Sequence, residues 1–531
     1  MQTVSENWKN AHKKRILKES FVEVSLDITD PDALADASPK DNGAIYISDS
    51  SELTNGVDKK TTPYCTLEQN LWCLDGNRKA IPESEFEDKS YASDVLSDDT
   101  CIFSSKLPII TINFSQVFSK YIPGITVTWS TTYGECADTF EVIAYNGDSV
   151  VASKGVVGNK SIKTIISVDI VEYDRIDIII KKWCLPNHRA RVEGIFIGLN
   201  KVYGKTELFD YSHKQSVDPV STSLPKVEIS FSIDNVNGEY NPHNANGLSK
   251  YLMERQEVKS RYGMKMDDGT IEWINGGTFY LSEWYAKQNG LTADFTARDL
   301  FEFMSATYYD DILQVAPRSL FNLAASVLQK ADLPLNSDNT VKWVIDESLK
   351  NIKTNAPLPT DTIANCLQLI ANAAECVIYQ DRTGTLRIEP LKSEDTDYKI
   401  DSFNSYSKSE ISLSKPIKQV NVVVYTYSVG NKGFESTTTE VSKVLGTTGE
   451  TITIDNPLIT DTTRASSLAT WLATHLAHRM SLDSSWRADV RLDALDIVAN
   501  ENAYNTNRVR MTDVEFKYNG AFRGAGKGKV I

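Results

Sequence analysis

The segment from Val227 to Leu300 constrains the fold more than any other part of the chain, because it combines strand patterns with a tightly specified turn. Residues 227–233 read VEISFSI and alternate apolar with polar side chains, which predicts a strand with one buried face. The next residues, DNVNGEYNP, contain Asn, Gly and Pro at positions that predict a turn. We therefore expect a β-rich unit, with further strands at residues 258–262, 278–284 and 291–297.

The beginning of the chain also carries strand signals. Residues 7–18 predict a short helix, and residues 21–28 alternate apolar with polar side chains as a half-buried strand does. Residues 44–47 (AIYI) are a further short strand candidate next to the turn residues Asn42 and Gly43.

From about residue 62 to residue 198 the composition becomes rich in cysteine, aromatic residues and strand signals, and the helical period is nearly absent. Turn residues such as Pro123-Gly124 and Asn146-Gly147 separate these strands. Many short strands divided by turns predict a self-contained β-sandwich or jelly roll, with strands at residues 109–114, 125–129, 140–145, 162–170 and 176–180.

The second half of the chain mixes both periods. Residues 319–330 and 362–375 place apolar side chains at helical spacing, and residues 376–389 then predict a hairpin with a D-x-x-G turn at Asp381–Gly384. This predicts a small α+β unit. Further on we expect a helix at residues 464–480, a mobile or partner-ordered glycine- and lysine-rich tail at 520–529, and strands at 419–427, 451–454, 487–492 and 509–518.

Composition excludes several classes of protein. The hydrophobic content of 41% and the charged content of 24% are ordinary for a soluble globular chain. A formal net charge of -15 disfavours stable binding to nucleic acid, because an acidic surface repels phosphates. The N-terminal segment lacks the apolar core of a signal peptide, and no apolar run reaches the roughly 18–20 residues that cross a bilayer. We therefore expect synthesis in a cytoplasm without a Sec-type export signal and without a membrane-spanning segment.

Residues that could support metal or catalytic chemistry are scattered. The seven cysteines contain no CxxC pair and are expected to be buried thiols. His475 and His478 lie three apart on a predicted helix, but packing is favoured over a metal pair because no carboxylate ligand is close in sequence. Asp94, Asp98 and Asp99 form the best acidic cluster, where a solvated loop is favoured over a carboxylate pair or a Ca²⁺ site. No GxSxG, HExxH, P-loop or GxGxxG motif is present, so no catalytic residue, cofactor or metal is predicted.

The aromatic residues of region 62–198 are the better binding candidates, because sugars stack on exposed aromatic faces. Trp129 alternates with Val127 and Ile125, so its side chain is expected in the core. The predicted saccharide or partner contacts are Tyr133, Tyr145 and Trp183.

The segment 227–300 resembles the first β-barrel of bacteriophage and prophage tail hub proteins of the type found in Gram-positive hosts. In that family a strand ends in D-N-x-x-G-x-[FY]-x-P, and strands with the patterns G-R/Q-x-V, G-x-[FY]-x-[IL]-x-x-W and L-T-A-x-D-L/R-D-L follow. The matching residues are Asp234, Asn235, Gly238, Tyr240, Pro242, Tyr251-Leu252, Arg255-Gln256-Glu257-Val258, Gly277, Phe279, Leu281, Trp284 and Thr296-Ala297-Arg298-Asp299-Leu300.

Two other regions are similar to parts of such proteins. Residues 371–389 (ANAAECVIYQDRTGTLRIE) resemble the helix-then-hairpin element of the family. Residues 66–76 and 182–198 match the patterns TLExNxWxLDG and KWCxPNxRARVExIxxG of an inserted jelly roll similar to carbohydrate-binding domains. The order of these motifs is more specific than any one of them, and the C-terminal quarter matches only loosely.

The resemblance implies a mainly β fold with α+β parts. It implies a first hub β-barrel from residues 1–61 and 200–306, interrupted by an inserted jelly roll at 62–199. A helix–hairpin domain at 307–400 and a second hub β-barrel at 401–531 complete the expected domains.

The function implied is structural and not enzymatic. The chain would form a homotrimeric ring in the virion tail or baseplate, joining the tail tube protein to baseplate or wedge proteins, a central spike or tail-tip protein, and the tape measure protein. One alternative is a receptor-binding tail protein that recognises host cell-wall saccharide through the inserted jelly roll. A tail-associated cell-wall hydrolase is a further alternative, and the particle can be a phage, with a contractile or non-contractile tail, or a tail-like bacteriocin.

Overall fold

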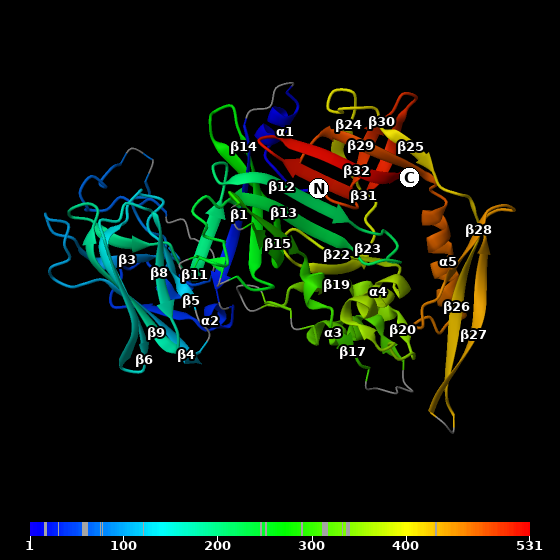
Figure 1. Cartoon of the computed structure of the whole chain (residues 1–531), viewed down its shortest axis with the longest axis horizontal. Helices are drawn as coiled ribbons and strands as arrows, with labels where there is room; N and C mark the ends of the chain where they lie inside the picture. The colour runs from blue at the N-terminus through cyan, green and yellow to red at the C-terminus, as the bar shows by residue number, and fades with distance from the viewer. Residues whose placement is uncertain are drawn as a thin grey trace. The chain divides into compact units, whose positions relative to one another are not determined.

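The computed structural model describes the whole chain except residues 15–18, 30, 56–61, 75, 77, 120–121, 245–246, 250–251, 288–289, 311–316, 332, 336–339 and 431–432. Figure 1 labels most of the elements. The chain forms two compact units. The first comprises Met1–Ser25, Val202–Pro334 and Val341–Ile531, and the second comprises Leu26–Lys201 with Leu335–Thr340.

A long sheet organises the first unit. Its strands follow the order β25 (Glu410–Leu413), β29 (Met480–Arg487), β32 (Phe522–Val530), β31 (Thr506–Tyr518), β12 (Leu208–Ser216), β13 (Lys226–Asp234), β16 (Thr292–Arg298), β15 (Ile271–Ala286), β14 (Glu257–Lys265) and β1 (Ser20–Thr29). On one side of β31, β30 (Ile497–Glu501) pairs with it and with β24 (Asp395–Ile400). The short helix α1 (Glu6–His12) precedes β1.

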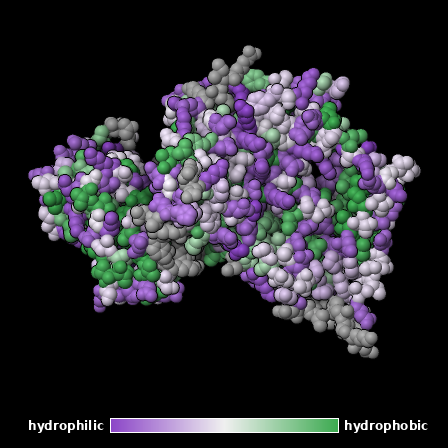
Figure 2. Space-filling model, in the orientation of Figure 1, coloured by the Kyte–Doolittle hydropathy of each residue, from purple (hydrophilic) through white to green (hydrophobic). Residues whose placement is uncertain are grey.

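Alternating side chains explain the position of β13 in this sheet. Val227, Ile229, Phe231 and Ile233 are buried, whereas the residues between them are more exposed. Phe231 is opposite Phe295 of β16, and their rings stack with centroids 5.2 Å apart. Figure 2 shows mainly hydrophilic residues over β12 and β13, as expected for the outward side of a sheet with one buried face.

Two helices and a hairpin form the α+β part of the first unit. The helices are α3 (Leu320–Gln329) and α4 (Ile363–Ala373), and each begins where a hydroxyl accepts a backbone N–H: Ser319 from Asn322, and Thr362 from Asn365. Both helices bury Ala and Leu side chains in one core with the hairpin. The hairpin strands β22 (Cys376–Gln380) and β23 (Leu386–Pro390) pair with each other, and β19 (Trp343–Ile345) pairs with β23. Short elements complete this part: β17 (Thr307–Tyr308) with β21 (Asp361–Thr362), β18 (Arg318–Ser319) with β20 (Lys353–Thr354), and the 3-10 turns η3 (Leu300–Phe303) and η4 (Glu347–Asn351).

A three-stranded sheet packs on the last helix. Its central strand β26 (Ile417–Gly430) lies between β27 (Gly433–Val444) and β28 (Glu450–Ile454), and α5 (Thr462–Leu476) contacts β26 and β27. Val420, Val422 and Val424 of β26 are buried, so the period of two directs one face of this sheet into the core that α5 completes.

The second unit holds two antiparallel sheets with one shared core. One sheet has the order β2 (Ser38–Asp41), β4 (Ile109–Phe118), β9 (Tyr173–Trp183), β6 (Ala137–Asn146) and β7 (Ser149–Val157). The other includes β11 (Gly194–Tyr203), β5 (Ile122–Thr128) and β8 (Lys163–Ile170), and β3 (Tyr91–Leu96) pairs separately with β10 (Arg189–Val192). Residues of both sheets meet in one hydrophobic cluster, with α2 (Pro31–Asp36) and η1 (Ser50–Glu52) nearby in the chain.

The prediction of a mainly β fold with α+β parts is confirmed. The strands expected between residues 227 and 300 are present, as are the helices expected near residues 319–330 and 362–375. In the described parts of the chain the two edge strands of the long sheet do not pair with each other, so the sheet is open and no closed barrel is found. The helix expected at residues 7–18 is present as α1 but ends at His12. Residues 15–18, like Tyr251 of the family pattern, lie outside the described residues.

Four sequence-based predictions of local structure are wrong. Residues 44–47 form no strand, because Ser48 N–H donates to Ile45 O and closes a turn. The helix expected to reach residue 480 ends at Leu476. Residues 488–492 leave the sheet, because the Asp489 carboxylate accepts the backbone N–H of Arg491. The tail expected to be mobile at 520–529 contains the ordered strand β32.

Candidate functional site

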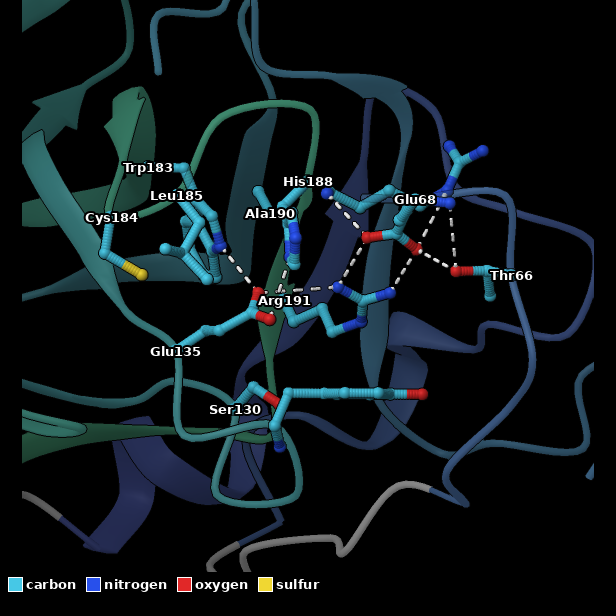
Figure 3. A network of polar contacts seen from close by, with 12 residues as sticks. Thr66, Glu68, Ser130, Glu135, Trp183, Cys184, Leu185, His188, Ala190 and Arg191 are labelled. Carbon is cyan, nitrogen blue, oxygen red and sulfur yellow. Dashed lines mark hydrogen bonds and ion pairs between the residues drawn. The ribbon is translucent and has the colours of Figure 1, made fainter. Parts of the chain in front are cut away.

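The second unit contains a buried network of charged side chains, in which the predicted contact residue Trp183 takes part (Figure 3). A second predicted contact residue, Tyr133, lies against Arg191 of this network. Trp183 is the last residue of β9, and Arg191 lies on β10. Glu68 comes from the long irregular segment of residues 62–90, which precedes β3. The network therefore joins this segment to the sandwich.

Glu68 and Arg191 form its central ion pair. The Arg191 Nη1 donates to Glu68 Oε2 at 2.8 Å, its Nη2 pairs with Oε1, and both side chains are nearly inaccessible to solvent. Glu68 also accepts the backbone N–H of Arg189 at 2.9 Å and the Thr66 hydroxyl at 2.9 Å. Burial alone would raise the pKa of Glu68, but the guanidinium of Arg191 holds it below its ordinary value.

Glu135 connects a second group of donors. Its carboxylate accepts the indole N–H of Trp183 at 2.9 Å and contacts the Nδ1 of His188 at 2.8 Å. The Nε2 of His188 lies 2.7 Å from the backbone oxygen of Gln69. Both ring nitrogens therefore face acceptors, and only the doubly protonated imidazolium satisfies both. Burial opposes this charge, yet the hydrogen bond and charge of Glu135 raise the pKa of His188.

Tyr133 is half-buried, and the guanidinium groups of two arginines lie over its ring. The guanidinium carbon of Arg191 lies 4.4 Å from the ring centroid, and that of Arg78 lies 5.4 Å from it. The Tyr133 hydroxyl accepts the backbone N–H of Tyr64 at 2.9 Å. Tyr133 therefore holds the segment 62–90 in place. A small cavity of about 20 Å³, enough for about one water molecule, lies beside it.

The other two predicted contacts occupy different environments. Trp183 is 0% exposed and meets the ring of Trp129 edge to face, with centroids 6.0 Å apart. It therefore presents no ring face to a sugar. Tyr145 lies on β6, half-buried, with the guanidinium of Arg175 4.0 Å from its ring centroid. Trp129 is buried, as predicted.

Sequence reasoning missed the network itself. Glu68 and Arg191 each stand inside one of the two inserted-module patterns, TLExNxWxLDG and KWCxPNxRARVExIxxG. An acidic residue in one pattern and a basic residue in the other could have indicated an ion pair between the two segments.

Exposed apolar side chains gather on the same segment. Trp72 is 59% exposed, Leu67 88% and Leu74 66%. Figure 2 shows hydrophobic residues on the loops of the second unit. Their exposure makes this segment, rather than the predicted aromatic residues, the more accessible apolar surface of this unit.

The acidic cluster expected at Asp94, Asp98 and Asp99 is not one site. Asp94 pairs with Lys106 at 2.9 Å, and Asp99 accepts the side-chain amide of Asn187. Asp98 accepts the backbone N–H groups of Thr100 and Ile102, as an aspartate does in a turn. Among the residues described, no group of three or more His, Cys, Asp or Glu side chains could hold a metal ion. Likewise, no helix in the described part of the chain is both long and apolar enough to cross a membrane.

In the first unit, a buried arginine fastens the hairpin to the long sheet. Arg382, at the turn between β22 and β23, donates to Asp493 Oδ1 at 2.6 Å, to Asn275 O at 3.1 Å and to Leu492 O at 3.0 Å. Burial alone would raise the pKa of Asp493, but Arg382 holds it below its ordinary value. The turn that resembles the family's D-R-D-G element therefore has a structural role.

A polar cleft of about 680 Å³ lies beside this contact. Charges of both signs line it, and several are already paired: Arg382 with Asp493, and Arg387 with Asp381. Tyr379, on the same hairpin, donates its hydroxyl to Glu389 at 2.6 Å. The lining of the cleft is therefore mixed in charge, and neither uniformly acidic nor uniformly basic.

Comparisons with known proteins give structural neighbours only. No protein-family model matches the sequence, and no curated protein matches it. A 43 kDa tail protein of a Shewanella oneidensis prophage is 11% identical, with a TM-score of 0.43, and covers 62% of this chain and 95% of its own. A Neisseria meningitidis tail protein is 12% identical, with a TM-score of 0.44, covering 62% and 93%. A prophage tail protein from Listeria monocytogenes is 9% identical, with a TM-score of 0.40, covering 63% and 91%. The solved structures that this chain is similar to thus include phage and prophage tail proteins.

Proposed function

We propose that this chain is a structural subunit of a phage or phage-tail-like particle. In this proposal it forms a trimeric hub ring that joins the tail tube to the baseplate or tail tip and to a central spike. The observation that carries the proposal is the order of the tail-hub motifs along the chain, from the turn at Asp234 to the hairpin ending at Glu389.

The described contacts are consistent with that role. Strand β12 pairs with β13 on one side and with β31 on the other, so segments nearly 300 residues apart in sequence share one sheet. Arg382 then joins the hairpin to the backbone at Asn275 and Leu492. A subunit that transmits mechanical load between a tube and a baseplate needs contacts between distant segments. Such contacts make the segments one cooperative unit of unfolding.

Native mass spectrometry of the purified full-length chain tests the ring. We expect a trimer, and a mass that stays monomeric at micromolar concentration would contradict the trimeric ring. Electron cryo-microscopy of the assembled particle tests the location, and density for this chain away from the tube–baseplate junction would contradict the hub assignment.

A second candidate function, recognition of host cell-wall saccharide by the second unit, is favoured by the exposure of Trp72 next to Gln69 and Asn70. Aromatic rings with neighbouring amides suit sugar binding. Co-sedimentation of the full-length chain with purified host cell walls tests it. Binding should fall on Trp72→Ala or Tyr145→Ala and persist in Ile411→Ala, which alters an exposed apolar residue of the first unit. Failure of wild-type protein to sediment with the walls would remove this candidate and leave the structural role standing.

A further inference from the structure

Four basic side chains of the first unit, from the end of α5, the loop after it, β31 and β32, act on one another electrostatically. Arg510 of β31 lies directly opposite Lys529 of β32. His475 is in the last turn of α5, and His478 follows two residues after the helix ends. Both histidines interact electrostatically with Arg510 and Lys529. We call these four residues the basic cluster.

Arg510 is the unusual member. The residue is 7% exposed, and its Nε and Nη1 atoms have no hydrogen-bond partner among the described residues. Burial, and then the like charge of Arg508, lower the pKa of Arg510, and no carboxylate of the described residues acts against them. A buried cation without a counter-charge costs several kcal/mol (on the order of 3–5).

Other buried arginines of the chain show what is missing. Arg191 has Glu68, Arg382 has Asp493, and Arg491 has Asp489. Each of these guanidinium groups lies against a carboxylate that offsets the cost of burial. Arg510 instead faces Lys529, and like charges directly opposite each other in a sheet destabilise it.

The pKa values of both histidines are lowered, in part by the positive charges of Arg510 and Lys529. Burial lowers the pKa of His475 to about 4, with Arg510, His478 and Lys529 acting in the same direction and Asp218 acting against them. Burial, Lys529 and Arg510 also lower the pKa of His478, while a hydrogen bond between His478 and the backbone of Val530 acts against them. The carboxylate of Asp218 already accepts the backbone N–H groups of Val220, Thr222 and Ser223, so it is committed to its own turn.

We propose that the basic cluster is a binding site for an oxyanion, which Arg510 holds through its free N–H groups with His475, His478 and Lys529 around it. Carboxylates and tetrahedral oxyanions both suit a guanidinium, which has planar, fixed donors. The oxyanion comes from one of two sources: a free inorganic anion, or an acidic side chain of another subunit. The site does not depend on the hub function proposed above.

Sulfate is the probe for the test, because its charge does not change between pH 5 and pH 8. We would measure histidine ring NMR signals of the full-length chain in chloride and in sulfate at matched ionic strength. Bound sulfate should raise the pKa of His475 and His478, and its affinity should therefore increase as the pH falls, by about tenfold for each unit of pKa shift. Unchanged histidine pKa values in sulfate would overturn a free-anion site.

Two matched variants separate this site from a general salt effect. Arg510→Met should abolish the response to sulfate, yet should melt in chloride no lower than the wild type, because an unpaired buried charge is removed. Arg508→Met, next along the same face of β31 and paired with Asp395, should keep the response. Equal responses of the two variants would overturn the proposal.

Native mass distinguishes the sources. If a partner's carboxylate occupies the cluster, Arg510→Met should lower the oligomeric mass in chloride, Arg508→Met should not, and sulfate should dissociate the wild-type oligomer. If a free anion occupies the cluster, sulfate should bind without changing the oligomeric state. No sulfate response together with an unchanged mass of Arg510→Met would refute both.

Discussion

Removing the guanidinium of Arg382 should destabilise the first unit more than the loss of any exposed ion pair. Arg382 donates to the Asp493 carboxylate and to the carbonyl oxygens of Asn275 and Leu492. Its side chain is 4% exposed and that of Asp493 is 21% exposed, so Arg382→Met leaves a largely buried carboxylate without its cation. Breaking such a buried pair from one side costs about 3–5 kcal/mol.

Two remaining contacts place the expected value at the lower end of that range. The side-chain amides of Gln2 and Gln215 also donate to Asp493, at 2.9 Å and 3.3 Å, and they stay in place in the variant. We therefore expect a loss of about 3 kcal/mol in the free energy of unfolding.

Urea denaturation followed by tryptophan fluorescence measures this loss as a shift of the transition that belongs to the first unit. Arg387→Met is the matched control on the same hairpin. Its side chain is 31% exposed and pairs with Asp381, so we expect a loss of less than about 1 kcal/mol. The double variant Arg382→Met, Asp493→Leu should recover most of the stability, because no charge is then left buried. Equal small losses for Arg382→Met and Arg387→Met would refute the role assigned to the buried pair.

Three further predictions concern acid stability, strand packing and activity. Burial lowers the pKa of His213 to about 3, so this ring is neutral in the fold; the unfolded chain binds its proton from about pH 6.5 downward, and stability should fall by a few kcal/mol (on the order of 4) between pH 6.5 and pH 3. His213→Gln should flatten that slope in denaturation curves measured across this pH range, and an unchanged slope would contradict the assignment. Gly524→Ala should lower stability by about 1–3 kcal/mol, because an added Cβ would lie 2.8 Å from the Trp486 ring, whereas Gly446→Ala, with nothing within 4 Å, should be close to neutral. A zymogram of the full-length chain on host cell walls should show no clearing, and a cleared band would favour the hydrolase alternative.

The sequence predicted element types well where one period dominates over many residues. The alternation in β13 and the Ala- and Leu-rich stretch of α4 both correspond to elements of the structure. The D-x-x-G turn was also predictable, because Gly384 adopts a φ of 82°, where glycine is favoured.

Two of the wrong predictions have physical causes that the structure shows. The glycines of residues 520–529 predict mobility, yet Gly524 and Gly526 are needed because an added Cβ would lie 2.8 Å and 3.2 Å from the Trp486 ring. Residues 44–47 have strand-forming side chains, but Tyr46 is 64% exposed and the backbone turns at Ser48. The contact of Trp486 with β32 joins segments distant in the chain, which a local pattern does not contain, whereas the turn at residues 45–48 is itself local.

The candidate sites were predicted less well than the fold. Aromatic content pointed to Tyr133, Tyr145 and Trp183, but the partners of an aromatic ring depend on residues far away in the chain. Trp183 is covered by Trp129, and Tyr133 lies against Arg191. The basic cluster is similar: His475 and His478 are visible as a pair in the sequence, while Arg510 meets Lys529 only through the register of β31 with β32.

The pairing of β12 with β31 has a consequence for how the chain is made. Residues 211–216 pair with residues 513–518, so the central sheet of the first unit is incomplete until the last strands have left the ribosome. The second unit draws almost all its residues from positions 26–201 and can complete its core much earlier. Folding in the order of synthesis therefore gives a finished second unit attached to a first unit with unpaired strand edges, which are prone to aggregation while they wait. Truncation before residue 513 should leave β12 paired with β13 but without β31 on its other edge, and such a chain should depend on chaperones to stay in solution.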